Sequence, residues 1–253
     1  MDSSSITGWL SQLSTARLRD LFGEGAERAS EWVRVLALEG VAQAQVCYGR
    51  MLLEGTGRPR NEHDAFTWFK RAASQGDLEA CNMVGRCLDQ GWGTEINLSL
   101  AAAFYHKAAD GGDAWAQYNL AHLYLDGMGV ERDAYTAFRY YRSAAAQEHA
   151  RAMNLTGRCC EEGWGTPKDF AAAADWYRRS AEAGYFRGQY NWASVLLKYG
   201  RAEEAAPWFE RAARSGTPAV REAVLQVAAL PTSPEPLAAL TERLRSAQEA
   251  LSA

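Results

Sequence analysis

The sequence predicts an all-α solenoid of about five 36-residue repeats, because three different patterns recur along the chain at one period. The motif Gly-x-Gly recurs every 36 residues, at Gly55–Gly57, Gly91–Gly93, Gly127–Gly129 and Gly163–Gly165. Small residues keep the same interval, at Gly49, Gly85, Ala121, Gly157 and Ala193. Aromatic pairs do so at Trp68–Phe69, Phe104–Tyr105, Tyr140–Tyr141 and Trp176–Tyr177, and a fifth pair, Trp208–Phe209, follows after 32 residues.

Each repeat is predicted to contain two helices. In residues 114–126, the apolar positions 116, 120, 123 and 124 have the spacing of one helical face. The Gly-x-Gly motif ends this first helix, since glycine adopts the left-handed conformation without a Cβ clash. Asp133 and Asp169 stand where an N-cap residue would open the second helix. That helix is alanine-rich and is expected to end at Gly76, Gly112, Gly184 or Gly216.

These residues resemble the Sel-1-like repeat, a branch of the tetratricopeptide superfamily. Residues 116–130 follow the pattern of that family closely, and the resemblance covers about residues 41–217. The chain departs from the pattern at Ala121, Thr156 and Cys160, and its fifth repeat is closer to a plain tetratricopeptide unit. The resemblance implies a right-handed α-α superhelical solenoid of helical hairpins that scaffolds protein complexes.

The two ends are expected to cap one continuous solenoid domain, because the end repeats otherwise leave an apolar face in water. The predicted parts are an N-terminal cap with a degenerate leading repeat (1–40), five repeats (41–217) and a C-terminal helical cap (218–253). In the last part, Ser233 is expected as N-cap and Pro234 as first helical residue of a closing helix. Its apolar face is predicted to comprise Leu237, Leu240, Leu244 and Leu251.

Composition and charge restrict the classes of function. The chain of 253 residues is 47% hydrophobic and 23% charged, which is typical of a folded protein. A net charge of −4 is too small to indicate nucleic acid or a membrane as the main partner. Residues 1–9 lack the basic and apolar pattern of a signal peptide, and the cysteine number is odd, so we expect a cytoplasmic protein. The cysteines are interpreted as core residues: Cys47, Cys81, Cys87, Cys159 and Cys160.

The sequence offers little that is typical of catalysis. The histidines fall in different repeats or at helix ends, with no His-Glu-x-x-His and no Cys-x-x-Cys: His63, His106, His122 and His149. The Gly-x-Gly loops lack the preceding strand and the further glycine or lysine of a nucleotide-binding loop. We therefore expect no enzyme activity, no cofactor and no metal.

A surface for a partner is predicted on the first helices, which line the concave groove in this superfamily. Three residues before each small residue stand Val46, Asn82, Tyr118, Asn154 and Tyr190. One residue after it stand Arg50, Arg86, His122, Arg158 and Ser194. The two columns are four residues apart and hence adjacent on the helix, and Trp115, Arg151 and Arg187 stand one turn earlier.

These residue types suit an extended peptide, because an amide can bond both backbone groups and a guanidinium can bind a carboxylate with two hydrogen bonds. We predict that the groove binds a protein or peptide segment, of acidic or carboxylate-bearing character. The predicted site residues are Arg50, Asn82, Arg86, Trp115, Tyr118, His122, Arg151, Asn154, Arg158, Arg187 and Tyr190. A second interpretation stays open, in which Arg50, Arg86, His122 and Arg158 pair with Glu54, Gln90, Asp126 and Glu162 on their own helices.

Repeats two and four resemble each other more than their neighbours, since residues 82–94 match residues 154–166. Trp92 and Trp164 in these segments are either anchors for a partner or plugs at the end of a hairpin. The leading hypothesis is a cytoplasmic adaptor or scaffold. The alternatives are an accessory or regulatory subunit that contacts an enzyme through the convex face or the Trp loops, a secreted or periplasmic repeat protein, and an enzyme. The oligomeric state is left open.

Overall fold

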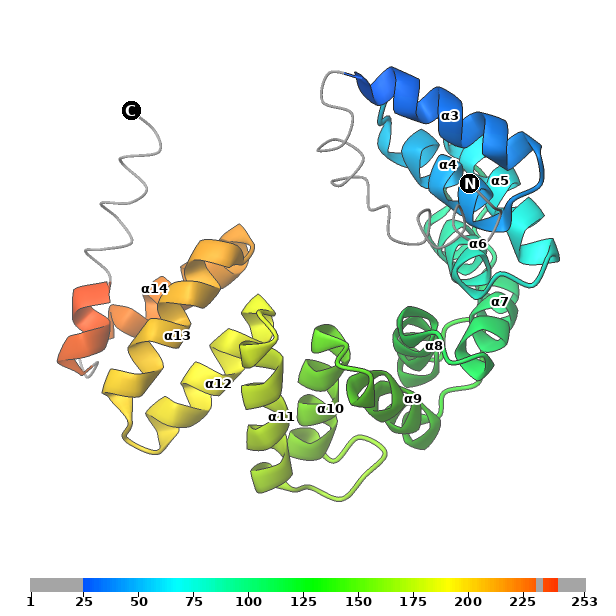
Figure 1. Ribbon diagram of the computed structural model, residues 1–253. Coiled ribbons are helices and arrows are strands. Elements are labelled where there is room, and N and C mark those ends of the chain that lie inside the picture. The colour runs from blue at the N-terminus through cyan, green and yellow to red at the C-terminus, as the bar shows by residue number, and fades with distance from the viewer. Residues whose placement is uncertain (1–24, 231–233, 241–253) are drawn as a thin grey trace. The chain divides into compact units, whose positions relative to one another are not determined.

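The computed structural model describes residues 25–230 and 234–240, and these ranges contain helices and no β-strand (Figure 1). This confirms the predicted all-α class. The helices are α3 (Ala26–Leu38), α4 (Ala42–Glu54), α5 (Glu62–Ser74), α6 (Leu78–Gln90), α7 (Leu98–Asp110), α8 (Ala114–Asp126), α9 (Ala134–Ala146), α10 (Ala150–Glu162), α11 (Phe170–Glu182), α12 (Phe186–Lys198), α13 (Ala202–Ser215) and α14 (Pro218–Ala228). None of these described helices is long and apolar enough to cross a membrane.

The described helices divide into two compact units between Arg132 and Asp133. Unit 1 contains α3–α8, and unit 2 contains α9–α14 and the short helical segment 235–240 (Figure 1). Within each unit, every α-helix packs against the next one along the chain. The even-numbered helices α4–α12 are the first helices of the five repeats, and the odd-numbered helices α5–α13 are their second helices. α14 follows in the place of a further first helix. That the whole chain forms one continuous domain remains a prediction.

The helix ends follow the predicted capping residues. First helices end at a left-handed glycine: Gly55, Gly91, Gly127 and Gly163, with φ of 74°, 74°, 72° and 78°. Second helices begin after a side chain that accepts a backbone N–H bond: Asn61, Asn97, Asp133 and Asp169. The predicted roles of the Gly-x-Gly motif and of Asp133 and Asp169 are therefore confirmed.

The second glycine of each Gly-x-Gly motif is required by close packing. A Cβ on Gly165 would overlap the backbone carbonyl of Ala134, at the start of α9. Gly57, Gly93 and Gly129 meet the backbone of Ala26, Glu62 and Leu98, which open α3, α5 and α7. All four glycines have a positive φ. Each loop therefore rests on the first residue of the preceding repeat's second helix, where no side chain fits.

The repeated small residue and the aromatic pair pack against each other inside a repeat. A Cβ on Gly157 would lie 2.9 Å from the ring of Tyr177, and one on Gly85 would lie 2.6 Å from Tyr105. The second aromatic of each pair is buried: Phe69, Tyr105, Tyr141, Tyr177 and Phe209. All five cysteines are also buried and unpaired, as predicted for core residues. Aromatic rings thus fill the space that the small residues leave between the helices.

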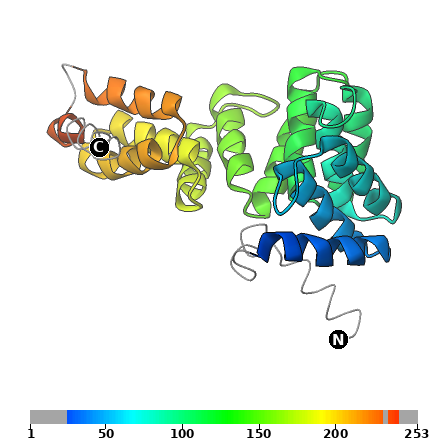
Figure 2. The same cartoon turned by 90° about the horizontal axis from the view of Figure 1, so that it is seen from above.

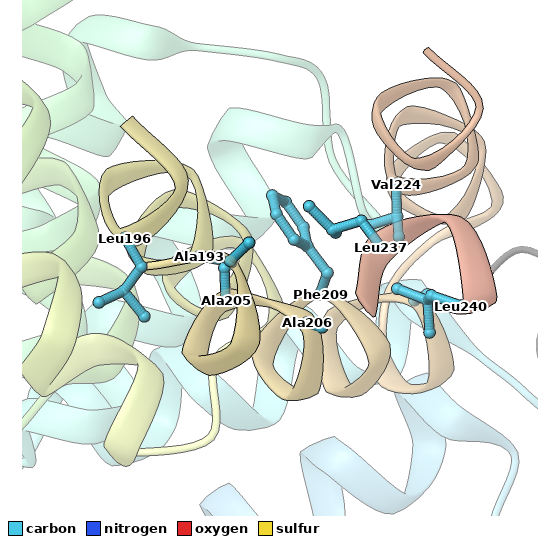
Figure 3. Close-up of a cluster of buried hydrophobic side chains, with 10 residues drawn as sticks. Ala193, Leu196, Ala205, Ala206, Phe209, Val224, Leu237 and Leu240 are labelled. Carbon is cyan, nitrogen blue, oxygen red and sulfur yellow. The ribbon is translucent and has the colours of Figure 1, made fainter. Parts of the chain in front are cut away.

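The end of unit 2 is held by one apolar cluster (Figure 3). Leu196 of α12, Phe209 of α13 and Val224 of α14 are buried together with Leu237 and Leu240. Figure 2 shows α14, in orange, lying beside the yellow helices α12 and α13. The burial of one such side chain stabilises the folded state by about 1.5–3 kcal/mol. The cluster therefore fixes α14 against α12 and α13.

The expected C-terminal cap is only partly described. Leu237 and Leu240 are buried, which agrees with the predicted apolar face. The helical segment begins at Glu235, so Pro234 lies one residue before it rather than at its first position. The predicted N-cap Ser233, the residues Leu244 and Leu251, and the part of the leading repeat before residue 25 lie outside the described residues.

Candidate partner-binding pocket

The asparagines expected on the groove surface, Asn82 and Asn154, are buried, with 5% and 4% of their area exposed. The oxygen Oδ1 of Asn82 accepts a hydrogen bond of 3.0 Å from Nδ2 of Asn119. In unit 2, Oδ1 of Asn154 accepts one of 2.8 Å from Nδ2 of Asn191. The expected position at the surface is therefore corrected: these amides join the first helices of successive repeats, because a buried amide must find a hydrogen-bond partner.

Four of the predicted residues come together at a pocket of about 460 Å³ in unit 2. The lining residues are Asn154, Leu155, Arg158 and Glu161 of α10, Tyr177 of α11, Arg187, Tyr190 and Asn191 of α12, and Thr217, Ala219, Val220 and Ala223 at α14. α12 contacts both α10 and α14, so three successive first helices surround the pocket. The four predicted site residues among the lining residues are Asn154, Arg158, Arg187 and Tyr190. We call this site the α10–α14 pocket.

Two guanidinium groups of the pocket have no acidic partner within residues 25–230 and 234–240. Arg158 is exposed, and its guanidinium lies 5.0 Å from the centre of the Trp164 ring. Arg187 is also exposed and lies 5.9 Å from the centre of the Phe186 ring. Neither forms an ion pair with any carboxylate of the described residues. The rings hold the cations by cation–π contact and leave their hydrogen-bond donors available to a ligand.

The second interpretation of the arginines, pairing along their own helices, does not hold for three of them. Arg50 of α4 forms an ion pair of 2.8 Å with Glu79 of α6, and not with Glu54. Arg86 stacks on Trp92 with 5.0 Å between the guanidinium carbon and the ring centre, as Arg158 does on Trp164. The nearby tryptophan in the Gly-x-Gly loop offers an aromatic face, which the sequence argument did not consider.

A carboxylate is fixed in the same pocket. The hydroxyl of Tyr177 donates a hydrogen bond of 2.6 Å to Oε2 of Glu161. Burial raises the pKa of Tyr177, and the hydrogen bond to Glu161 raises it further. The hydroxyl therefore stays protonated near neutral pH and remains a donor to Glu161.

The N-terminus of α14 also lies at the pocket. Its N-cap residue Thr217 makes no side-chain cap hydrogen bond, and its first residue, Pro218, has no N–H group. Thr217 and Ala219 line the pocket. Because the N-terminal end of a helix carries a partial positive charge, it adds to the attraction for an anion.

The other predicted residues are not among those that line this pocket. On α8 of unit 1, Trp115 is 47% exposed and meets Tyr118 edge-to-face at 6.2 Å, and Tyr118 meets His122 at 4.7 Å. Burial lowers the pKa of His122, opposed by Asp126 and Asp89, so the ring favours the neutral form. Arg151 of unit 2 is exposed beside the Tyr185 ring and is not among the lining residues.

Several residues of the pocket were not predicted from the sequence, chiefly Glu161, Tyr177, Asn191 and Thr217. Asn191 could have been found, because it follows Asn154 by the same 37 residues that separate Asn119 from Asn82. Thr217 had no such indication, since its place depends on how α14 folds over α12. No group of three or more His, Cys, Asp or Glu within the described ranges is placed to hold a metal ion.

The repeat pattern and the paired helices agree with a known family. The model of the Sel1 repeat matches residues 41–77, 78–113, 116–149, 150–185 and 187–217. The chain belongs to the Sel1 repeat family. Sel1 repeat proteins generally mediate protein–protein interaction and are typically non-catalytic scaffolds. No curated protein compared with the chain matches it.

Solved structures share this fold. A protective antigen of uropathogenic Escherichia coli strains, which displays an SLR fold, matches with a TM-score of 0.71 and 24% identity over 91% of this chain. The chain covers 52% of that protein, about half its length. A Sel1 repeat protein from Oxalobacter formigenes matches with a TM-score of 0.70 and 28% identity, over 78% of this chain and 83% of that one. An immunity protein from Pseudomonas aeruginosa matches at 0.56 and 17%, over 83% and 81%.

Proposed function

We propose that this Sel1 repeat chain is a non-enzymatic scaffold that captures an acidic segment of a partner protein in the α10–α14 pocket. The observation that supports this most directly is the pair Arg158 and Arg187. Both line the pocket, and neither has a carboxylate partner among the described residues. A partner carboxylate would supply the missing counter-charge.

The walls of the pocket suit a peptide rather than a small ion. Leu155, Val220 and Ala223 provide apolar surface beside the two cations. Tyr190 is partly buried and meets the Phe209 ring edge-to-face at 5.4 Å, so its side chain is held by the core. Rigid aromatic and cationic side chains are frequent anchors of protein interfaces, because little conformational entropy is lost when they bind.

The proposal also includes the cellular compartment and the choice of this pocket over the loop tryptophans as the binding surface. Five buried free cysteines favour a reducing compartment, so we place the scaffold in the cytoplasm. An accessory subunit that binds through Trp92 or Trp164 is less favoured, since each ring is half-buried and has a guanidinium over it. Arg158, the guanidinium over Trp164, itself lines the pocket, so the Trp164 ring supports the proposed site rather than forming a separate surface.

The test is a selection of displayed random peptides on the intact chain, followed by calorimetry with the selected peptides. We expect sequences rich in Asp and Glu. The double variant Arg158→Ala with Arg187→Ala should bind them about ten- to a hundred-fold more weakly for each charge-assisted hydrogen bond that is lost.

The matched control is Arg179→Ala. Arg179 belongs to the same unit and lies 4.3 Å from the centre of the Trp176 ring, but it is outside the pocket. Its removal takes away a stacked cation without changing the proposed site, so affinity should stay the same. Selected peptides that bind the double variant as tightly as the original chain would contradict the proposed function.

A further inference from the structure

Glu161 has no evident place in an anion-binding pocket, because it brings a negative charge to the site that should attract an acidic segment. It lines the pocket together with Arg158 and Arg187. Neither arginine is within ion-pair distance of it, since no such pair occurs among the described residues. The carboxylate is therefore not there to neutralise the arginines.

The structure fixes Glu161 in position through Tyr177. The Tyr177 ring is 3% exposed and packs on Gly157, where a Cβ would lie 2.9 Å away. Its hydroxyl then reaches Oε2 of Glu161 at 2.6 Å, a charge-assisted hydrogen bond. The other oxygen, Oε1, has no hydrogen-bond partner among the described residues. Tyr177, packed on Gly157, thus holds the negatively charged carboxylate of Glu161 at the pocket.

The charged side chains of the pocket sum to one positive charge, from two arginines and one glutamate. A single carboxylate balances that charge. A phosphorylated side chain brings about −1.5 to −2 at neutral pH, so part of its charge would face Glu161 without compensation. Like charges at such a site disfavour binding, and binding proteins use such repulsion to exclude similar ligands.

We infer that Glu161 is a specificity-determining residue, which makes the pocket select a carboxylate side chain and reject a phosphorylated one. The inference rests on the proposed function and adds to it the class of anion. In the partner, an aspartate or glutamate enters between Arg158 and Arg187, and its neighbouring backbone N–H group can donate to Oε1 of Glu161.

The experiment uses three pools of short synthetic peptides with randomised neutral flanks, whose central residue is glutamate, phosphoserine or glutamine. Each pool is titrated against the intact chain and against Glu161→Gln, which keeps an oxygen that can accept from Tyr177 and removes the charge. The unit 1 counterpart of Glu161 is Asp89, which accepts from Tyr105. Asp89→Asn is therefore the matched control, and melting curves confirm that all three chains are folded.

We expect the original chain and Asp89→Asn to bind the glutamate pool about tenfold more tightly than the phosphoserine pool. In Glu161→Gln this ratio should fall about tenfold, to equality or below. An unchanged ratio in Glu161→Gln, or a preference of the original chain for phosphoserine, would overturn the inference and leave the proposed function standing. Absence of binding to all three pools by the original chain would overturn both.

Discussion

Units 1 and 2 contain the same two-repeat arrangement, 72 residues apart, and differ in the chemistry that it presents. Both place a partly buried Asn–Asn hydrogen bond between successive first helices, of 3.0 Å in unit 1 and 2.8 Å in unit 2. Both stack an arginine on a loop tryptophan at 5.0 Å, Arg86 on Trp92 and Arg158 on Trp164. The Asn–Asn bond joins successive repeats, whereas the Arg–Trp contact lies within one repeat.

The differences lie at the exposed and half-exposed positions. Tyr105 reaches Asp89 at 3.4 Å, and Asp89 also accepts from Gln90, whereas Tyr177 reaches the longer Glu161 at 2.6 Å. Trp115 of unit 1 corresponds to Arg187 of unit 2. On the same repeat packing, the two units therefore present different side chains, an exposed aromatic ring on α8 and an exposed cation on α12.

The asparagine hydrogen bonds are equivalent in the two units and should contribute equally to stability. Asn154→Ala and Asn82→Ala should each lower the free energy of unfolding by about 2–3 kcal/mol, since each leaves an amide without its partner and opens a small cavity. Urea denaturation followed by circular dichroism measures this. A loss in one unit and none in the other would break the comparison.

The tyrosine bonds should differ between the units. Tyr177→Phe removes a short bond to a carboxylate and should cost about 1.5–2 kcal/mol, whereas Tyr105→Phe removes a longer bond and should cost about 0.5–1 kcal/mol. The same denaturation measurement decides. Equal losses would mean that the geometry of Glu161 is not special to unit 2, and would weaken its proposed role in specificity.

The side chains that cap a first helix by a hydrogen bond also differ, being Asp77 and Asp113 in unit 1 and His149 in unit 2. Nδ1 of His149 accepts a hydrogen bond of 3.1 Å from the backbone N–H of Ala152. Burial, helped by Arg151, lowers the pKa of His149 from 6.5 to about 4. Between these values the unfolded chain binds a proton that the folded chain does not.

Its contribution to stability is therefore complete above pH 6.5 and is lost as the pH falls from 6.5 to about 4. His149→Asn keeps a capping side chain without a titrating group. The difference in melting temperature between pH 7 and pH 4.5 should be smaller by a few degrees in His149→Asn than in the original chain. An equal difference would show that this cap does not contribute to the pH response.

The repeat, the helix caps and the aromatic packing could be predicted because they depend on local spacing. Gly163 ends a helix, and Asp169 begins one, through contacts within a few residues. The pocket depends on contacts that spacing does not encode. Asn154 turned out to be buried because its partner, Asn191, lies on the next first helix, and Thr217 reaches the pocket only because Val224 anchors α14.

The close approach of each loop glycine to the preceding repeat has a consequence for how such a chain can evolve. Each of these contacts, from Gly57 with Ala26 to Gly165 with Ala134, joins residues that are 31 positions apart. An inserted residue between the two partners would therefore break the contact or strain the loop. Residues 187–217 contain no Gly-x-Gly, and their aromatic pair already follows after 32 residues instead of 36. Gained or lost residues are therefore expected to accumulate in the fifth repeat, beside the wall of the pocket. Related chains should therefore differ in the length of the fifth repeat. They should also differ in the partner that they bind, because this repeat contributes to the pocket.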